Sequence, residues 1–141
     1  MKIGELAKVT KCTTETIRYY EKLGLLPIPE RGVNNYRLYN QKHKYRLNFI
    51  RNCRSLAMSH DEIRSLLMLM DKPPADCSDV NNLLEDHIKH VDMRLHELIE
   101  LKTQLNHLQQ QCQNEDVIDH CGILRGLQAM ENRDKSQSHL K

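Results

Sequence analysis

Residues 78–120 read SDVNNLLEDHIKHVDMRLHELIELKTQLNHLQQQCQNEDVIDH, a stretch that contains neither proline nor glycine. Apolar side chains recur in it at steps of three or four, the spacing of a stripe along one face of a helix. The stripe consists of Val80, Leu84, Ile88, Val91, Leu95, Leu98, Leu101, Leu105, Leu108 and Cys112. We therefore predict one long helix over residues 80–112.

Three cysteines bracket this helix: Cys77 precedes it, Cys112 ends it and Cys121 follows it. Cys77 and Cys112 lie 35 positions apart, which in a helix corresponds to about 50 Å. They therefore cannot meet within one chain. A second copy, antiparallel around a two-fold axis, would bring its Cys77 beside Cys112 and Cys121. The spacing predicts a homodimer with thiol sites at its interface.

Composition favours a reduced, intracellular environment. The 141 residues contain no N-terminal apolar segment of the kind that directs export and no run of 18 apolar residues, so we expect neither secretion nor a membrane span. Five cysteines, an odd number, occur without a secretion signal. That combination favours metal binding or redox chemistry over a disulfide framework.

Charge divides the chain into two halves. Residues 1–70 carry 13 Lys and Arg against 6 Asp and Glu, a net charge of +7, whereas residues 71–141 carry 8 against 13, a net charge of −5. A basic half joined to an acidic helical half indicates a nucleic-acid reader attached to an assembly element.

The basic half begins with a predicted helix-turn-helix. Ile3, Leu6 and Ala7 form a short helical stripe, and Thr13 or Thr14 is a good N-cap for a second helix to about Lys22. We expect Ile17 and Tyr20 to face inward. The outward residues would be Thr16, Arg18, Tyr19 and Lys22. Arginine and tyrosine both bond phosphates, and arginine also recognises guanine.

A wing and a second helical pair follow. Asn34–Asn35 before Tyr36–Tyr39 predicts a short hairpin with Arg37 and one tyrosine exposed. Helices are expected over about 41–56 and 59–70, with Ser59 and Glu62 as a capping box. Their expected core is Leu47, Phe49, Ile50, Leu56, Met58, Ile63, Leu66 and Leu67, with Met68 and Met70 also packed inside.

The predicted fold is therefore mainly α: a winged helix-turn-helix DNA-binding domain, then a long dimerisation helix that forms an antiparallel coiled coil. Lys72–Pro73–Pro74 marks the hinge between them. The expected divisions are 1–71 for DNA binding, 72–79 for the hinge, 80–112 for dimerisation, 113–127 for a metal-binding loop and short turn, and 128–141 for a disordered tail.

Several motifs resemble the MerR family of transcription regulators. They are Ile3–Ala7, Glu15–Glu21, Gly24–Leu26, Asn35–Tyr39, Phe49–Arg51 and Asp61–Ile63. Within the family, Arg51–Leu56, Glu85–Ile88 and Cys121–Leu124 resemble the cadmium- and lead-responsive branch. The resemblance implies DNA contacts by Arg18, Tyr36, Arg37 and Arg54. It also implies a bacterial cytoplasmic protein that activates RNA polymerase at a promoter by distorting double-stranded DNA.

Three thiolates make a soft, anionic site that suits Cd²⁺, Pb²⁺, Hg²⁺ or Zn²⁺ rather than Mg²⁺ or Ca²⁺. Because the thiols must lose their protons, we expect metal binding to weaken as pH falls. Pb²⁺ tolerates three thiolates on one side, whereas Cd²⁺ and Zn²⁺ usually take a fourth ligand, for which His120 or water is available. The mercury-responsive branch has similarly arranged cysteines, so residue types leave the metal open.

Other residues have two interpretations each. His87 and His90 form either part of a second metal site, with His139 from the tail, or a solvated helix face. Cys53 fits a packed core thiol. Cys12 is a bystander or an oxidation sensor. Finally, the basic residues Lys42, Lys44 and Arg46 contact phosphate or only solvent.

Enzymatic functions find no support, because the chain lacks a Gly-rich phosphate loop, a G-x-S-x-G motif and a specific carboxylate pair. Three functions remain: a metal-responsive regulator, a thiol redox sensor with the same DNA-binding half, and a metal-sequestering protein. Operator binding separates the third from the others. A chelator-reversible metal response separates the first from the second.

Overall fold

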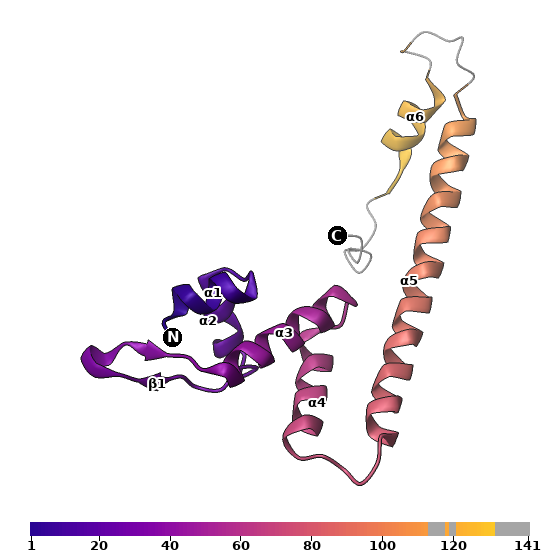
Figure 1. Ribbon diagram of the computed structural model, residues 1–141. Coiled ribbons are helices and arrows are strands. Elements are labelled where there is room, and N and C mark those ends of the chain that lie inside the picture. Colours follow the sequence, from indigo (N-terminus) through magenta and orange to yellow (C-terminus); the bar gives the residue numbers. More distant parts are fainter. Residues whose placement is uncertain (113–117, 119–120, 132–141) are drawn as a thin grey trace. The chain divides into compact units, whose positions relative to one another are not determined.

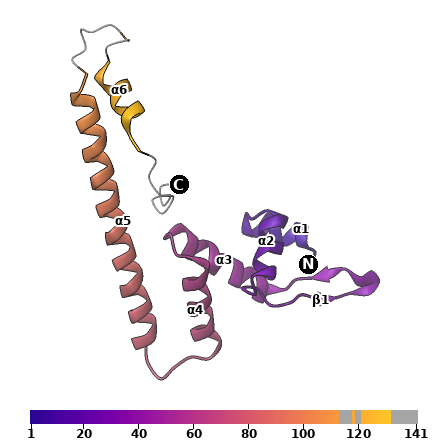
Figure 2. The ribbon, with the colours of Figure 1, turned by 180° about the vertical axis from the view of Figure 1, so that it is seen from behind.

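The computed structural model describes residues 1–112, 118 and 121–131 (Figures 1 and 2). It is mainly helical and divides into two compact units, Met1–Leu84 and Glu85–Lys141. His120, His139 and most of the predicted tail lie outside the described residues. In the part of the chain that is described, no helix combines the length and apolarity needed to cross a membrane.

The first unit opens with the expected helix-turn-helix. Helix α1 spans Ile3–Thr10 and helix α2 spans Thr14–Lys22. The Thr13 side chain accepts a hydrogen bond from the Thr16 backbone N–H, which satisfies a free donor of the first turn. Apolar side chains from both helices are fully buried, so the two helices share one core.

The wing is a short hairpin. Strand β1 (Glu30–Arg31) pairs antiparallel with β2 (Arg37–Leu38), and the 3₁₀ turn η1 (Val33–Asn35) joins them. Asn34 and Asn35 adopt φ values of 67° and 63°, which asparagine tolerates better than most residues. Figure 1 shows the hairpin extending away from α1 and α2.

Helices α3 (Gln41–Ser55) and α4 (His60–Asp71) complete the unit, and each begins with a capping box. The Ser59–Glu62 box agrees with the sequence prediction. The α3 box joins Asn40 to His43, whose ring takes the place of the usual glutamate. The core consists of Leu6, Ile17, Tyr20, Leu25, Leu26, Tyr39, Leu47, Ile50, Cys53, Met58, Ile63 and Leu67.

Three residues predicted for this core are exposed. Leu56 is 62% exposed, because α3 ends at Ser55 and Leu56 forms its C-cap, away from the buried face. Met68 and Met70 are 65% and 52% exposed. On α4 the buried stripe is taken by Ile63 and Leu67, and a methionine one position beyond Leu67 points to another side of the helix.

Ser59→Ala is expected to lower the free energy of unfolding by about 1 kcal/mol, because it removes the acceptor for the Glu62 N–H. Chemical denaturation of the variant measures the loss. The matched control is Ser65→Ala on the same helix, where the hydroxyl only donates to the Asp61 carbonyl and alanine is a better helix former. Equal losses in the two variants would contradict the capping argument.

Helix α5 runs from Ser78 to Gln110, 33 residues without a break. Helix α6 (Gly122–Ala129) turns back along the last turns of α5 in both views (Figures 1 and 2). Much of the predicted apolar stripe on α5 is exposed in the single chain: Val80, Leu84, Ile88, Val91, Leu95, Leu98 and Leu105. A stripe of this kind on a long helix is typical of one that pairs with another helix.

Candidate DNA-binding surface and metal centre

Helix α2 presents the predicted recognition face. Ile17 and Tyr20 are buried, whereas Arg18 and Tyr19 are exposed, as the sequence predicted. The Tyr19 ring meets the His60 ring edge-on, with centroids 5.6 Å apart. Burial and the nearby Arg54 and Arg64 guanidinium groups lower the pKa of His60. The lowered pKa favours the neutral form of the His60 ring, which packs against Tyr19.

The wing is tied to α2 through Glu21. Arg37 Nη1 donates to Glu21 Oε2 at 3.0 Å, and the Tyr39 hydroxyl donates to Glu21 Oε1. Burial, with the bond to Glu21, raises the pKa of Tyr39 to about 12, so the phenol keeps its proton. Arg37, predicted to contact DNA, is thus held by a carboxylate. Tyr36 remains exposed, with Lys2 Nζ 4.5 Å from its ring centroid.

Several arginines hold the domain together, which the sequence did not reveal. Each donates to a backbone carbonyl distant from it in the chain or at a helix end. The pairs are Arg46 with Leu25, Arg51 with Thr10, Arg54 with Met58, and Arg64 with Leu23. Arg46 also forms a two-pronged ion pair with Asp71, at 2.7 and 2.9 Å. These bonds account for the position of the Arg46 side chain without any contact to DNA phosphate.

Cys77 lies exposed immediately before α5, and its carbonyl accepts a hydrogen bond from the Asn81 N–H at 2.9 Å. The neighbouring Asp76 carboxylate accepts from the Ser78 N–H, and its hydrogen bonds to Ser78 lower the pKa of Asp76. Within its own unit, Cys77 also lines an apolar groove of about 630 Å³. Phe49, Leu66, Met70, Pro73 and Val80 are among the other lining residues.

Cys112 and Cys121 are brought to the same end of the second unit. Cys112 follows the last turn of α5, and Cys121 is the N-cap of α6. Gln111 and Gly122, the residues beside them, are in direct contact: a Cβ on Gly122 would lie 2.0 Å from the Gln111 carbonyl oxygen. Both thiols are half-buried. The backbone contact thus lies between the chain neighbours of two of the three predicted metal ligands.

Two of the three thiols therefore sit at helix N-termini, Cys77 before α5 and Cys121 before α6. The positive end of a helix dipole stabilises a negative charge at this position. Thiolates are soft ligands for Cd²⁺, Pb²⁺, Hg²⁺ and Zn²⁺. The donor set thus fits a soft divalent metal.

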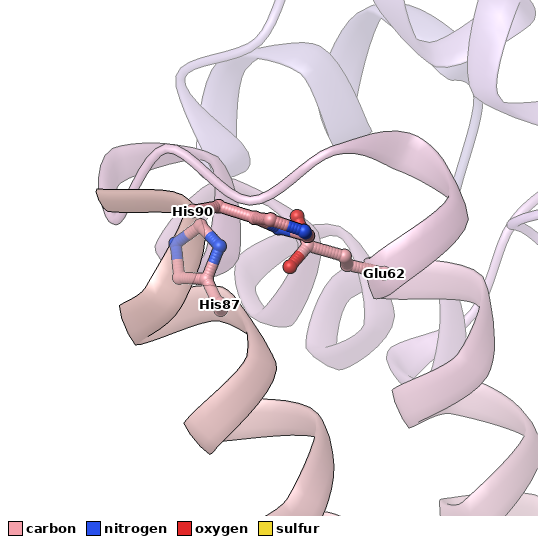
Figure 3. A group of neighbouring side chains, drawn as sticks. All are labelled: Glu62, His87 and His90. Carbon is pink, nitrogen blue, oxygen red and sulfur yellow. The ribbon is translucent and has the colours of Figure 1, made fainter. Parts of the chain in front are cut away.

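The remaining candidates are placed as follows. His87 and His90 lie on α5 with ring centroids 6.5 Å apart and their planes at 84° (Figure 3). His87 is buried and His90 is exposed. Cys53 is buried, as predicted, and burial raises the pKa of its thiol. Cys12 packs against the core of the first unit.

Two family models match the chain. The MerR helix-turn-helix family regulatory protein matches residues 1–69, and the MerR DNA-binding model matches residues 45–108. A homolog of the regulator ZntR from Haemophilus influenzae is 44% identical over 129 residues, covering 87% of this chain and 96% of the relative. The mercuric resistance operon regulatory protein of Bacillus cereus is 36% identical, covering 89% and 96%. Both names describe regulators, in agreement with the prediction that the chain is not an enzyme.

Solved structures give the same assignment. The transcription regulator PbrR691 from Ralstonia metallidurans CH34, in complex with lead(II), has a TM-score of 0.80 and 45% identity, covering 90% of this chain and 98% of that one. The regulator MerR from Bacillus megaterium MB1, in complex with mercury(II), has a TM-score of 0.72 and 32% identity, covering 91% and 99%. The chain therefore belongs to the MerR family of helix-turn-helix transcription regulators.

Proposed function

We propose that the chain is a transcription activator that responds to a soft divalent metal, Cd²⁺ or Pb²⁺. The observation that carries this proposal is the backbone contact between Gln111 and Gly122, which are the chain neighbours of Cys112 and Cys121. The similarity to a regulator solved with lead(II) supports it. Hg²⁺ and Zn²⁺ remain alternatives within the same donor chemistry.

The third thiolate comes from a second copy of the chain. The exposed apolar stripe of α5 supports a dimer, because it needs a partner helix. In an antiparallel coiled coil, the start of one α5 lies beside the end of the other. The partner's Cys77 then completes a site with Cys112 and Cys121, twice per dimer.

Pb²⁺ would take these three thiolates alone, whereas Cd²⁺ or Zn²⁺ would add water or His120. His87 and His90 supply a second, nitrogen-rich set of donors on α5. Imidazole nitrogen suits Zn²⁺ and related ions, so the pair is a candidate for a second metal site, and a helix-face role without metal is the alternative.

The DNA-binding half reads a two-fold operator, with one α2 helix in the major groove of each half-site. Thr16, Arg18 and Tyr19 on α2 face the bases and phosphates, and Tyr36 on the wing faces the flanking backbone. Arg37 and Arg54 act partly through the structure: Arg37 holds the wing on Glu21, and Arg54 bonds the Met58 carbonyl. A guanidinium has five N–H donors, so both arginines retain some for phosphate.

Arg18→Ala is expected to weaken operator binding by about 1–3 kcal/mol, since the side chain is exposed on α2 and an arginine contact to guanine is worth this much. Fluorescence anisotropy with operator DNA at fixed salt measures the change. Lys102→Ala on α5 removes the same charge far from α2 in the sequence, and we expect less than a twofold effect. Comparable losses in both variants would indicate a general charge effect.

Metal capture controls transcription by shifting an equilibrium between two DNA geometries. The metal-free dimer holds the promoter, with RNA polymerase present, in an inactive form. The metal-bound dimer favours a bent and untwisted form in which the promoter elements align. A tenfold induction needs only about 1.4 kcal/mol of difference in metal affinity between the two forms.

In vitro transcription from the operator promoter tests the proposal. We expect added Cd²⁺ or Pb²⁺ to raise transcript levels and a chelator to reverse the increase. A response to an oxidant that thiol reductants reverse, with none to metal, would instead identify a redox sensor.

A further inference from the structure

We propose that Gly122 is a positioning residue of the metal centre. Its missing side chain lets α6 begin directly against the Gln111 carbonyl, and this contact sets the separation of the Cys112 and Cys121 sulfur atoms. The inference rests on the proposed function, because it concerns the same thiolates. It adds a residue that carries no ligand atom of its own.

The contact is between two backbones. A Cβ on Gly122 would lie 2.0 Å from the Gln111 carbonyl oxygen, 2.8 Å from its carbonyl carbon and 3.1 Å from its Cβ. Real side chains do not approach a backbone oxygen this closely, so any residue other than glycine must push α6 away from the end of α5. Cys121 directly precedes Gly122, and Cys112 directly follows Gln111. Such a displacement therefore separates the two thiols.

The end of α5 is shaped to receive this contact. The Gln111 N–H donates to the Leu108 carbonyl at 3.0 Å, and the Cys112 N–H donates to the Gln109 carbonyl at 3.2 Å. These bonds tighten the last turn. The Gln111 carbonyl then meets the first residue of α6, so the negative end of one helix faces the positive end of another, which is favourable.

Gly126, one turn later on α6, provides a matched comparison. A Cβ there would lie 2.6 Å from Gln111 Oε1 and 2.9 Å from Leu108 Cδ2. Both atoms are ends of flexible side chains, which rotate away at low cost, whereas the Gln111 carbonyl belongs to the backbone. The two glycines thus differ in what blocks a side chain, and only Gly122 is expected to control the thiol separation.

The test compares Gly122→Ala with Gly126→Ala in the full-length protein. The first readout needs no metal: equilibration with oxidised and reduced glutathione, followed by peptide mapping of the Cys112–Cys121 disulfide. Two thiols form the disulfide while one oxidised glutathione becomes two reduced glutathiones. The equilibrium constant gives the effective concentration of one thiol at the other. We expect at least a tenfold decrease for Gly122→Ala and less than a threefold change for Gly126→Ala.

The second readout is Cd²⁺ affinity, followed by the thiolate-to-metal ultraviolet band. We expect Gly122→Ala to bind about 10–100-fold more weakly, as when the support of a metal ligand is lost, with operator affinity of the metal-free protein unchanged. Helix propensity alone predicts the opposite sign, since alanine is the better helix former.

Unchanged disulfide equilibrium and Cd²⁺ affinity in Gly122→Ala would overturn the inference and leave the proposed function intact. The proposed function itself fails separately, if Cys112→Ser and Cys121→Ser bind Cd²⁺ as the wild type does.

Discussion

Cys77→Ser is expected to abolish metal-induced transcription and to leave operator binding by the metal-free protein within twofold of wild type. Cys77 is exposed and contributes nothing to the core, so serine should not disturb the fold. The hydroxyl is a poor ligand for a soft metal. Structural zinc sites with four ligands bind with about 10–16 kcal/mol. One ligand in such a site is therefore worth on the order of 3 kcal/mol, about a hundredfold in Kd.

Titration with Cd²⁺, Pb²⁺, Hg²⁺ and Zn²⁺, observed through the thiolate-to-metal ultraviolet bands, measures this loss. We expect saturation near one thiolate-bound metal per chain in the wild type, a weakened band in Cys77→Ser, and a ranking of the four ions. Cys12→Ser is the control, because Cys12 packs against the core of the first unit. Its band should match the wild type. An unchanged band in Cys77→Ser would show that Cys77 is not a metal ligand and that the site is built from other residues.

Ile17→Ala is expected to lower the free energy of unfolding by about 2–5 kcal/mol, the usual cost of emptying a fully buried aliphatic position. Ile17 is 0% exposed and anchors the inner face of α2 in the core. Domains are stable by only about 5–15 kcal/mol, so this loss is a large fraction of the total. Because α2 carries the recognition face, operator affinity should fall with the fraction of folded protein.

Ile28→Ala is the matched control for chemical denaturation. Ile28 is 92% exposed in the loop before the wing, so the same substitution should change the free energy of unfolding by less than about 0.5 kcal/mol. A similar loss in the two variants would mean that burial does not determine the effect.

Local chemistry explains why much of the fold could be predicted. Thr13 and Ser59 are caps whose partners lie within three residues, and the apolar spacing of α5 repeats over 33 residues. Such signals need only neighbouring positions. The inward side of α2, with Ile17 and Tyr20, follows from the same helical spacing.

Contacts between distant residues explain what could not be predicted. Glu21 meets Arg37 and Tyr39 across 16 and 18 positions, and Arg46 meets Asp71 across 25. Nothing local distinguishes these charges from solvated ones, so the sequence predicts a DNA contact for Arg37 and does not decide between phosphate and solvent for Arg46. The burial of an apolar residue can be equally hard to predict from local sequence. Leu56 is exposed because α3 ends at Ser55, one residue before it.

The candidate metal centre was predicted by residue type rather than by geometry. Cysteine spacing indicates Cys112 and Cys121 as partners, but no cysteine pattern reveals the backbone contact between their neighbours Gln111 and Gly122. The glycine at position 122 was visible in the sequence. Its role required the position of the Gln111 carbonyl.

Metal stoichiometry of a mixed dimer tests the central claim, that Cys77 acts across the subunit interface. One subunit carries Cys77→Ser, and the other carries Cys112→Ser with Cys121→Ser. If the partner supplies Cys77, the first subunit's Cys112 and Cys121 join the second subunit's intact Cys77. We then predict one three-thiolate Cd²⁺ or Pb²⁺ site per mixed dimer. If all three thiols had to come from one chain, neither subunit would hold a complete set, and the absence of any such site would contradict the account.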